Sequence, residues 1–198
     1  MGLSKQAKIL TKPQIKAVLN YLETTRHPTR NRLIFLLSIR AGLRAKEIAS
    51  LSWDMVTDAE GELTASIRLT NEASKGQKGG RVIPISKDLQ AALADWKLEA
   101  VSFVRPSRFI VTTERSSKTS AQAIVNMFQG WYRALGFQGV SSHSGRRTAI
   151  TSWARQIGSV GGSLRDVQVL AGHSALSTTQ RYIEADVDAQ RRVVEKLV

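Results

Sequence analysis

The feature that most constrains the fold is one interruption in an otherwise helical hydrophobic pattern. Residues 62–69 and 80–86 alternate in polarity or are β-branched, and a basic, glycine-containing loop separates them. Elsewhere apolar residues recur at helical spacing, over 12–24, 29–41, 44–52, 87–103, 119–135, 144–157, 163–171, 177–184 and 187–197. The pattern predicts a mainly α-helical (α+β) domain with a small antiparallel sheet, to which residues 53–56 could add a third strand.

Side chains that can cap helices refine two of these ends. Thr11 is the expected N-cap of the first helix, because its hydroxyl can accept from a free backbone N–H. Ser177 or Thr178 is expected to cap the helix that carries Tyr182 in the same way.

The charge of the chain favours a polyanionic partner. Its 198 residues carry 29 basic and 16 acidic side chains, a formal net charge of +13, and every third of the chain shares the excess. A folded surface of this kind attracts polyanions, of which DNA and RNA are the commonest. A basic protein without such a partner is the ordinary alternative.

Several classes of protein are excluded or disfavoured by composition. Cysteine is absent, which excludes disulfides and thiolate metal sites. The N-terminus lacks the apolar core of a signal peptide, and no stretch approaches the ~18 apolar residues of a membrane helix. We therefore expect one cytosolic domain with no membrane attachment.

Two of the three histidines stand where a phosphate could bind. His143 precedes Arg146 by three positions at the start of an expected helix, where free N–H groups and the helix dipole favour an anion. The two side chains share a helix face and could hold two oxygens of one phosphate. His173 follows Gly172 in an expected turn, nine residues before Tyr182.

Each of these residues also has an ordinary explanation when taken alone. A histidine at a helix end usually caps or packs, and a tyrosine on an amphipathic helix is usually a core residue. Arg44 and Glu47 could form a simple i, i+3 ion pair, and Lys75 and Lys78 could be solvated loop residues.

In their order along the chain, four segments resemble the motifs of one family, the tyrosine recombinases or phage integrases. Residues 41–53 (AGLRAKEIASLSW) are similar to its first catalytic-arginine motif, and residues 74–85 (SKGQKGGRVIPI) to its lysine-bearing β-hairpin. Residues 143–146 (HSGR) match its His-x-x-Arg motif. Residues 171–182 resemble its second-histidine and nucleophile segment. The resemblance covers roughly residues 10–190.

The resemblance implies a helical tyrosine-recombinase catalytic domain with a small three-stranded antiparallel sheet, and it implies a transesterification. Tyr182 would attack a DNA phosphorus, form a 3′-phosphotyrosyl bond and release a 5′-hydroxyl. A second 5′-hydroxyl would then restore the phosphodiester, so no ATP, metal or other cofactor is expected. Arg44 and Arg146 would bind the non-bridging oxygens. His173 would donate a further bond, and His143 would donate likewise or help to deprotonate the tyrosine.

Other residues receive supporting roles from the resemblance. Lys75 is the expected general acid for the leaving 5′-oxygen, with Lys78 as the alternative. Glu47 is expected to orient the first arginine without reacting itself. Lys78, Arg81 and Arg147 are further candidates for DNA binding.

The chain departs from the family pattern in two ways. Ser144 and Gly145 stand where the family more often has aspartate and leucine, and we expect them to loosen the helix that carries Arg146, because glycine costs ~1 kcal/mol relative to alanine inside a helix. The usual N-terminal DNA-clamping domain is missing from residues 1–198. We therefore expect a single catalytic domain with weakened DNA affinity.

The implied partners are double-stranded DNA and further copies of the chain, which would form a tetramer on paired DNA sites. The apolar stripe of residues 187–198 suits a helix that packs on its own domain or on a neighbouring protomer. The implied source is a bacterium or phage, and the implied role is DNA integration or recombination of a mobile element. A tyrosine-linked topoisomerase, a telomere resolvase and a catalytically silent DNA-binding regulator remain alternatives.

Overall fold

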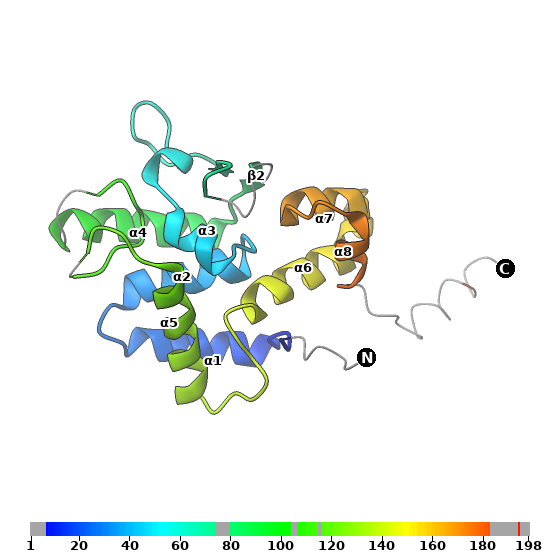
Figure 1. Ribbon diagram of the computed structural model, residues 1–198, viewed down its shortest axis with the longest axis horizontal. Coiled ribbons are helices and arrows are strands. Elements are labelled where there is room, and N and C mark those ends of the chain that lie inside the picture. Colours follow the sequence, from blue (N-terminus) through cyan, green and yellow to red (C-terminus); the bar gives the residue numbers. More distant parts are fainter. Residues whose placement is uncertain (1–6, 74–79, 104–106, 115, 183–193, 195–198) are drawn as a thin grey trace.

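The computed structural model of the protein describes residues 7–73, 80–103, 107–114, 116–182 and 194, and helices dominate them (Figure 1). Most helices lie close to the ranges that hydrophobic spacing predicts, and the helix expected over 187–197 lies outside the described residues except at residue 194. In chain order the elements are α1 (Lys12–Glu23), α2 (Pro28–Ile39), α3 (Ala45–Ser50), the 3₁₀ turn η1 (Trp53–Met55), β1 (Ser66–Leu69), β2 (Arg81–Pro84), α4 (Lys87–Phe103), α5 (Ala121–Ala134), α6 (Ser144–Gln156), the 3₁₀ turn η2 (Ile157–Val160), α7 (Leu164–Ala171) and α8 (Leu176–Gln180).

The first two helices follow their sequences closely. At the N-cap of α1 the Thr11 hydroxyl accepts from the Gln14 N–H at 3.4 Å, and the Gln14 side chain accepts from the Thr11 N–H at 2.9 Å. This reciprocal pair satisfies two donors that a helix start leaves free, so the predicted cap is confirmed. Helix α2 begins at Pro28 and is buried on most sides, which places it at the centre of the helical layer.

The sheet is smaller than the resemblance implies. Strands β1 and β2 pair antiparallel, from Ser66 opposite Pro84 to Leu69 opposite Arg81. Among the described residues these are the only two strands, so the expected third strand over 53–56 is wrong. That segment forms η1, because the Val56 N–H donates back to the Trp53 carbonyl at 2.9 Å. The mainly helical fold class is confirmed.

Helices α1–α5 and the sheet, hereafter the main body, surround one large hydrophobic core. Trp96 of α4 is fully buried, and its indole N–H donates to the Ile110 carbonyl at 2.7 Å. Phe35 of α2 and Phe128 of α5 lie with ring centroids 6.4 Å apart, so aromatic contact joins the two central helices.

Helices α6, α7 and α8, hereafter the C-terminal helices, form a layer beside the main body (Figure 1). Their own hydrophobic cluster contains three buried side chains, Ile150, Val167 and Ala171. Trp153 and Tyr182 pack against that cluster and are partly buried. Because so little apolar surface is buried within this layer, its attachment to the main body depends on close packing and polar contacts.

The start of α6 is tightly packed against α2. A β-carbon added at Gly145 would lie 2.4 Å from the Ser38 Oγ and 3.0 Å from the Ser38 Cβ, so only glycine fits there without displacement. Ser144 is fully buried, and its Oγ accepts from the Ser141 N–H at 3.0 Å. The expectation that these two residues loosen the helix is therefore not met, because both of them pack its first turn.

The short helix before Tyr182 also differs from expectation. Helix α8 begins after Ala175, which makes no side-chain capping bond, so the prediction of a cap at Ser177 or Thr178 is wrong. The helix ends at Gln180, two residues before Tyr182. Tyr182 therefore lies beyond the helix end, although its backbone N–H still donates to the Thr179 carbonyl at 3.0 Å.

Candidate active site

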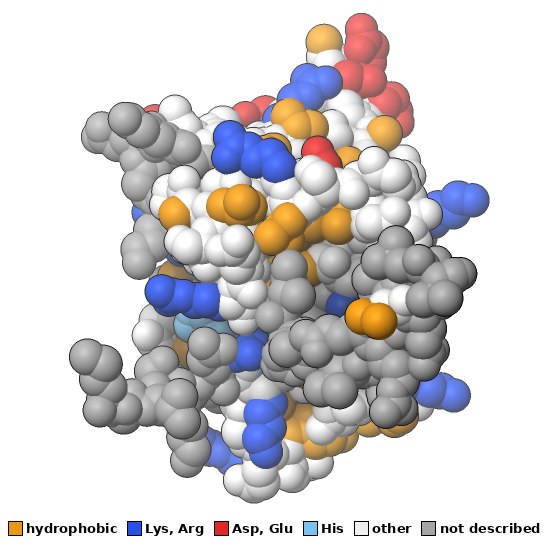
Figure 2. All heavy atoms as spheres, turned by 90° about the vertical axis from the view of Figure 1, so that its right-hand side faces the viewer, with side chains coloured by type: hydrophobic (Ala, Val, Ile, Leu, Met, Phe, Trp, Pro, Cys, Tyr) orange, Lys and Arg blue, Asp and Glu red, His pale blue; other side chains and the backbone are white. Residues whose placement is uncertain are grey.

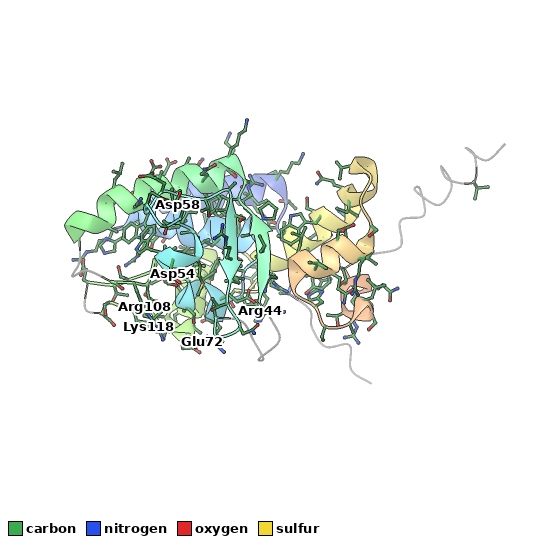
Figure 3. All side chains as sticks on the ribbon, turned by 90° about the horizontal axis from the view of Figure 1, so that it is seen from above. Arg44, Asp54, Asp58, Glu72, Arg108 and Lys118 are labelled. Carbon is green, nitrogen blue, oxygen red and sulfur yellow. The ribbon has the colours of Figure 1, made fainter. Side chains whose placement is uncertain are left out.

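A cavity of about 680 Å³ opens between the main body and the C-terminal helices. Its lining brings together five residues that the sequence singled out, namely Arg44, His143, Arg146, His173 and Tyr182. Figure 3 places Arg44 on the side of the main body that faces the C-terminal helices. Three segments that are far apart in the chain, at residue 44, at 143–146 and at 173–182, thus meet at one cavity.

The cavity is electropositive. Arg147 and Arg181 join Arg44 and Arg146 in its lining, and no acidic side chain is among the described residues that line it. On the face shown in Figure 2, lysine and arginine side chains occur from top to bottom, whereas acidic side chains gather toward the upper edge. A site of this kind suits an anion such as a phosphate.

Arg44 is held at the N-terminus of α3 by one carboxylate. Its backbone N–H donates to Glu47 Oε2 and its Nη1 donates to Glu47 Oε1, both at 2.8 Å. The Arg44 side chain is 28% exposed, so the rest of its guanidinium lies open to the cavity. The geometry agrees with the expectation that Glu47 orients Arg44.

Glu47 itself is fully buried and shared by two arginines. Arg81 donates to it from both terminal nitrogens, at 3.0 Å to Oε1 and 3.0 Å to Oε2. Burial alone would raise the pKa of the Glu47 carboxyl, but the bonds and charges of Arg81 and Arg44 outweigh it and lower that pKa below its usual value. Glu47 is therefore a buried, ionised carboxylate that holds Arg44 and Arg81.

Arg146 links the main body to the C-terminal helices from within α6. Its Nη1 donates to the Gly42 carbonyl at 2.5 Å and its Nη2 to the Ala171 carbonyl at 2.7 Å. The residue is only 5% exposed. Burial and the charges of Arg44 and Arg81 lower the pKa of Arg146 to about 10, which still leaves it protonated at neutral pH. Its Nε–H has no hydrogen-bond partner among the described residues.

His173 stands in the turn that follows α7, where Gly172 adopts a positive φ of 63°. The expected turn between helices is therefore confirmed. Its Nε2 lies 3.2 Å from Arg146 Nη2 and its Nδ1 lies 2.9 Å from Thr179 Oγ1. Because the arginine can only donate, Nε2 must accept, which places the imidazole proton on Nδ1. Burial and the charge of Arg146 lower the pKa of His173 to about 4, so the ring is neutral at pH 7.

Tyr182 is placed by ring stacking and by the small C-terminal cluster. Its ring lies parallel to that of His173 within 25°, with centroids 5.4 Å apart. The other two tyrosines, Tyr21 and Tyr132, pack on the core of the main body. Of the three, Tyr182 alone is among the described residues that line the cavity.

His143 and Arg147 complete the mouth of the cavity at the start of α6. His143 is the N-cap residue of that helix and is exposed, with no side-chain capping bond. Arg147 is half-buried and follows Arg146 into the lining. Both positions are compatible with contact to a bound polyanion.

The other expected site residues are not among the described residues that line the cavity. Lys75 and Lys78 lie outside the described residues. Arg81, expected to bind DNA, is buried, with its side chain 4% exposed and its guanidinium donating inward to Glu47. A phosphate on the surface could not reach it in this position.

Sequence reasoning did not single out the residues that hold His173. Thr179 is fully buried and bonds its Nδ1, while Gln168 donates from Nε2 to the His173 carbonyl at 2.9 Å and accepts the His173 N–H at 3.1 Å. Both are ordinary polar residues in short helices, so only the three-dimensional contact distinguishes them. The position of Thr179, three residues before Tyr182, was the one available signal.

The described residues contain neither a metal-binding cluster nor a membrane-spanning helix. No three histidine, aspartate or glutamate side chains gather where they could hold a metal ion in that part of the chain. None of its helices is both long and apolar enough to cross a membrane.

The sequence model of the phage integrase family matches residues 8–188 of the chain. The chain is 32% identical over 192 residues to the tyrosine recombinase XerA of Thermococcus kodakarensis, an alignment that covers 96% of this chain. It spans 62% of the length of that relative.

Solved structures agree in fold. The crystal structure of XerA recombinase matches with a TM-score of 0.75 and 22% identity, over 95% of this chain and 64% of that one. The Tn1549 transposon integrase in complex with circular intermediate DNA matches with a TM-score of 0.77 and 20% identity, over 100% of this chain and 68% of that one. At these identities the likeness concerns the fold.

Proposed function

The chain belongs to the phage integrase family, and on that premise we propose that it is the catalytic domain of a site-specific DNA recombinase. The observation that carries the proposal is the convergence of Arg44, His143, Arg146, His173 and Tyr182 on one electropositive cavity. Each of these side chains has a task at a single phosphate, and a cavity of about 680 Å³ can admit a DNA phosphate with its sugar.

The proposed reaction is a pair of transesterifications. The Tyr182 oxygen attacks the phosphorus, so that a 3′-phosphotyrosyl bond forms as the bond to the 5′-oxygen breaks. The phenol proton leaves to a base, and the 5′-oxygen receives a proton and departs as a hydroxyl. The reverse attack by a 5′-hydroxyl on a second strand rejoins the DNA. The number of phosphoester bonds is unchanged, which is why no ATP enters the scheme.

The arginines supply the charge that the transition state requires. Negative charge builds on the non-bridging oxygens during phosphoryl transfer. Arg44 has an open guanidinium edge, and Arg146 keeps its Nε–H without a partner among the described residues. Because Glu47 and two backbone carbonyls already hold these groups, little reorganisation is needed when the phosphate arrives.

His173 is proposed to act as a donor to a phosphate oxygen once DNA is bound. In the structure its Nε2 accepts from Arg146 and carries no proton. A bound phosphate would attract the arginine and would offset the positive charge that keeps the ring neutral. Both effects favour a proton on Nε2. Thr179 Oγ1 can accept from Nδ1 if the ring carries both protons, or donate to Nδ1 if the proton has moved to Nε2, because a hydroxyl both donates and accepts.

The proton transfers are assigned to residues at the mouth and in the hairpin loop. His143 is exposed beside the cavity and is proposed to donate to the phosphate or to take the phenol proton. Lys75, with Lys78 as the alternative, is proposed to protonate the leaving oxygen. Arg147 is proposed to contact the DNA backbone. The proposed partners are double-stranded DNA and, on DNA, further copies of the chain in a tetramer.

A nicked suicide substrate tests the proposal. Such a DNA loses the short strand that carries the 5′-hydroxyl, so a covalent protein–DNA complex accumulates. We expect a covalent band with the wild type and with Tyr21→Phe, a matched control for a tyrosine outside the cavity, and none with Tyr182→Phe. The band should persist in EDTA. A band that survives Tyr182→Phe would contradict the nucleophile. DNA binding with no band from the wild type would favour a catalytically silent regulator.

A further inference from the structure

Arg81 of β2 is not among the described residues that line the cavity, and it bonds to two other elements. Its Nη1 and Nη2 donate to the two oxygens of Glu47 in α3, and its Nε donates to the Leu170 carbonyl in α7 at 2.9 Å. It is the first residue of strand β2. Residues 74–79, which precede it with only Gly80 between, lie outside the described residues. One guanidinium therefore connects strand β2 with the helix that begins after Arg44 and with the helix that precedes His173.

Resting on the proposed function, we propose that Arg81 is a positioning residue that sets the distance between Arg44 and His173 across the cavity. It does not touch the phosphate itself. On one side it acts through Glu47, which holds both the backbone and the side chain of Arg44. On the other side it acts through the Leu170 carbonyl, three residues before His173.

The packing of the turn before His173 supports this role. A β-carbon at Gly172 would lie 2.8 Å from Arg81 Nη1 and 3.0 Å from Arg81 Cδ. The backbone that presents His173 therefore rests directly on the arginine. Any shift of this guanidinium must move either that backbone or Glu47.

The chemistry of the side chain explains why arginine is needed. A planar guanidinium can reach three acceptors in fixed directions, whereas a lysine ammonium is a point charge on a flexible stem. Buried ion pairs add little net stability compared with apolar packing, so stability alone is a poor reason for this arrangement. Misplacement of a catalytic group by 1 Å can cost about 100-fold in rate. Accurate placement of Arg44 and His173 is therefore a sufficient reason for an arginine at position 81.

The experiment separates position from folding. Cleavage of the suicide substrate is followed in single turnover at saturating protein for Arg81→Lys and Arg81→Gln. We expect the rate constant to fall about 100-fold in both, with the affinity for uncleavable DNA changed less than about 3-fold. Arg68→Lys and Arg68→Gln are matched controls, because Arg68 lies exposed on the paired strand β1. A purely structural role would lower the amplitude, which reports the folded fraction, and would leave the rate constant unchanged.

The pH profile provides a second readout. Glu47 faces Arg44 of α3, Arg81 of β2 and, at longer range, Arg146 of α6. Arg81→Gln removes one of those charges, so burial raises the pKa of the Glu47 carboxyl, and the low-pH loss of cleavage should move to higher pH. Arg81→Lys keeps the charge and should keep the wild-type profile while it loses rate.

The outcomes distinguish this inference from the proposed function. A wild type that forms no covalent complex overturns the proposed function and, with it, this inference. A wild type that cleaves, together with an Arg81→Lys rate constant within about 3-fold of it, overturns the positioning role alone. If Arg81→Gln does not fold, Arg81→Lys decides the matter, because it leaves Glu47 with a buried cationic partner.

Discussion

The main body and the C-terminal helices both line the cavity but differ in how much apolar surface stabilises each of them. Among the described residues the hydrophobic cluster of the main body contains thirty buried side chains, whereas the cluster of the C-terminal helices contains three. The main body presents Arg44. The C-terminal helices present His143, Arg146, His173 and Tyr182.

Polar and close-packed contacts at the junction therefore decide the geometry of the site. Arg146 reaches across to the Gly42 carbonyl, Arg81 reaches across to the Leu170 carbonyl, and Gly145 lies against Ser38. The large core of the main body positions Arg44, which is proposed to neutralise the phosphate charge. The C-terminal helices, with their small core, position Tyr182, the proposed nucleophile, and its placement rests on a few contacts that single substitutions can remove.

The strongest test of this difference compares Arg146→Ala with Arg44→Ala. Both should reduce cleavage by about 1000-fold or more, because each removes charge from the transition state. Arg146→Ala should also destabilise the protein, by about 3 kcal/mol, since the buried carbonyls of Gly42 and Ala171 lose their donor. Arg44→Ala should cost less, because Glu47 keeps both of its bonds from Arg81. Thermal unfolding and suicide-substrate cleavage measure the two effects. Equal unfolding temperatures for the two variants would contradict the linking role of Arg146.

Glycine-to-alanine substitutions in α6 and in α5 should change the free energy of unfolding in opposite directions. Gly145→Ala adds a methyl group 2.4 Å from Ser38 Oγ and should cost about 1–3 kcal/mol of unfolding free energy. Gly130→Ala in α5 is the matched control, because nothing lies within 4 Å of its new methyl group, and it should gain about 1 kcal/mol. Urea denaturation measures both.

The partner of Gly145 sharpens this test. Gly145→Ala combined with Ser38→Gly should be more stable than the sum of the two single changes, because the second change removes both atoms that the methyl group approaches. Ser38→Gly alone should cost about 1 kcal/mol, since it places a glycine inside α2. If the double variant is no more stable than the sum of the single changes, α2 and α6 do not meet at this pair.

Within the C-terminal helices, Thr179→Val tests how His173 is held. The change removes the partner of Nδ1 and should slow cleavage about 10-fold, with a loss of about 1 kcal/mol in stability. Thr179→Ser keeps the hydroxyl and should retain most activity, and Ser177→Ala, an exposed change on the same helix, is the control. Equal activity of the valine and serine variants would remove Thr179 from the site.

The pKa of His173 predicts a smaller effect with a defined sign. Its value of about 4 in the folded protein lies below the ordinary 6.5, so the unfolded chain binds the proton more readily. The stabilisation is complete above pH 6.5 and is lost as the pH falls toward 4. The unfolding temperature of the wild type should therefore fall more steeply over this window than that of His173→Gln. Histidine NMR that found His173 titrating near 6.5 would contradict the buried, arginine-flanked ring.

Much of the fold follows from local pattern, and particular residues mark where that ends. Helical spacing predicts α1, α2 and α4 nearly to the residue, because their apolar faces meet one large core. The third strand was wrong at Trp53–Met55, where a short apolar run suits a 3₁₀ turn as well as a strand. The cap of α8 was wrong because serine and threonine signals are weak in a helix of five residues.

The order of the motifs predicts which residues gather at the cavity. It does not predict the residues that hold them in place. Arg44, Arg146, His173 and Tyr182 stand in segments with recognisable spacing. The burial of Arg81 depends on Glu47, a partner on another element, and the need for Gly145 depends on Ser38. Such pairings are set by tertiary contact, which periodicity and spacing within one segment cannot reveal.

The most direct test of the whole account is to locate the covalent bond. The complex trapped on suicide DNA is digested with protease and nuclease, and the nucleotide-bearing peptide is sequenced by mass spectrometry. The account predicts one adduct, a nucleotide joined through its 3′-phosphate to the Tyr182 oxygen. An adduct on Tyr21, on Tyr132 or on any other side chain, or a bond through a 5′-phosphate, would contradict it.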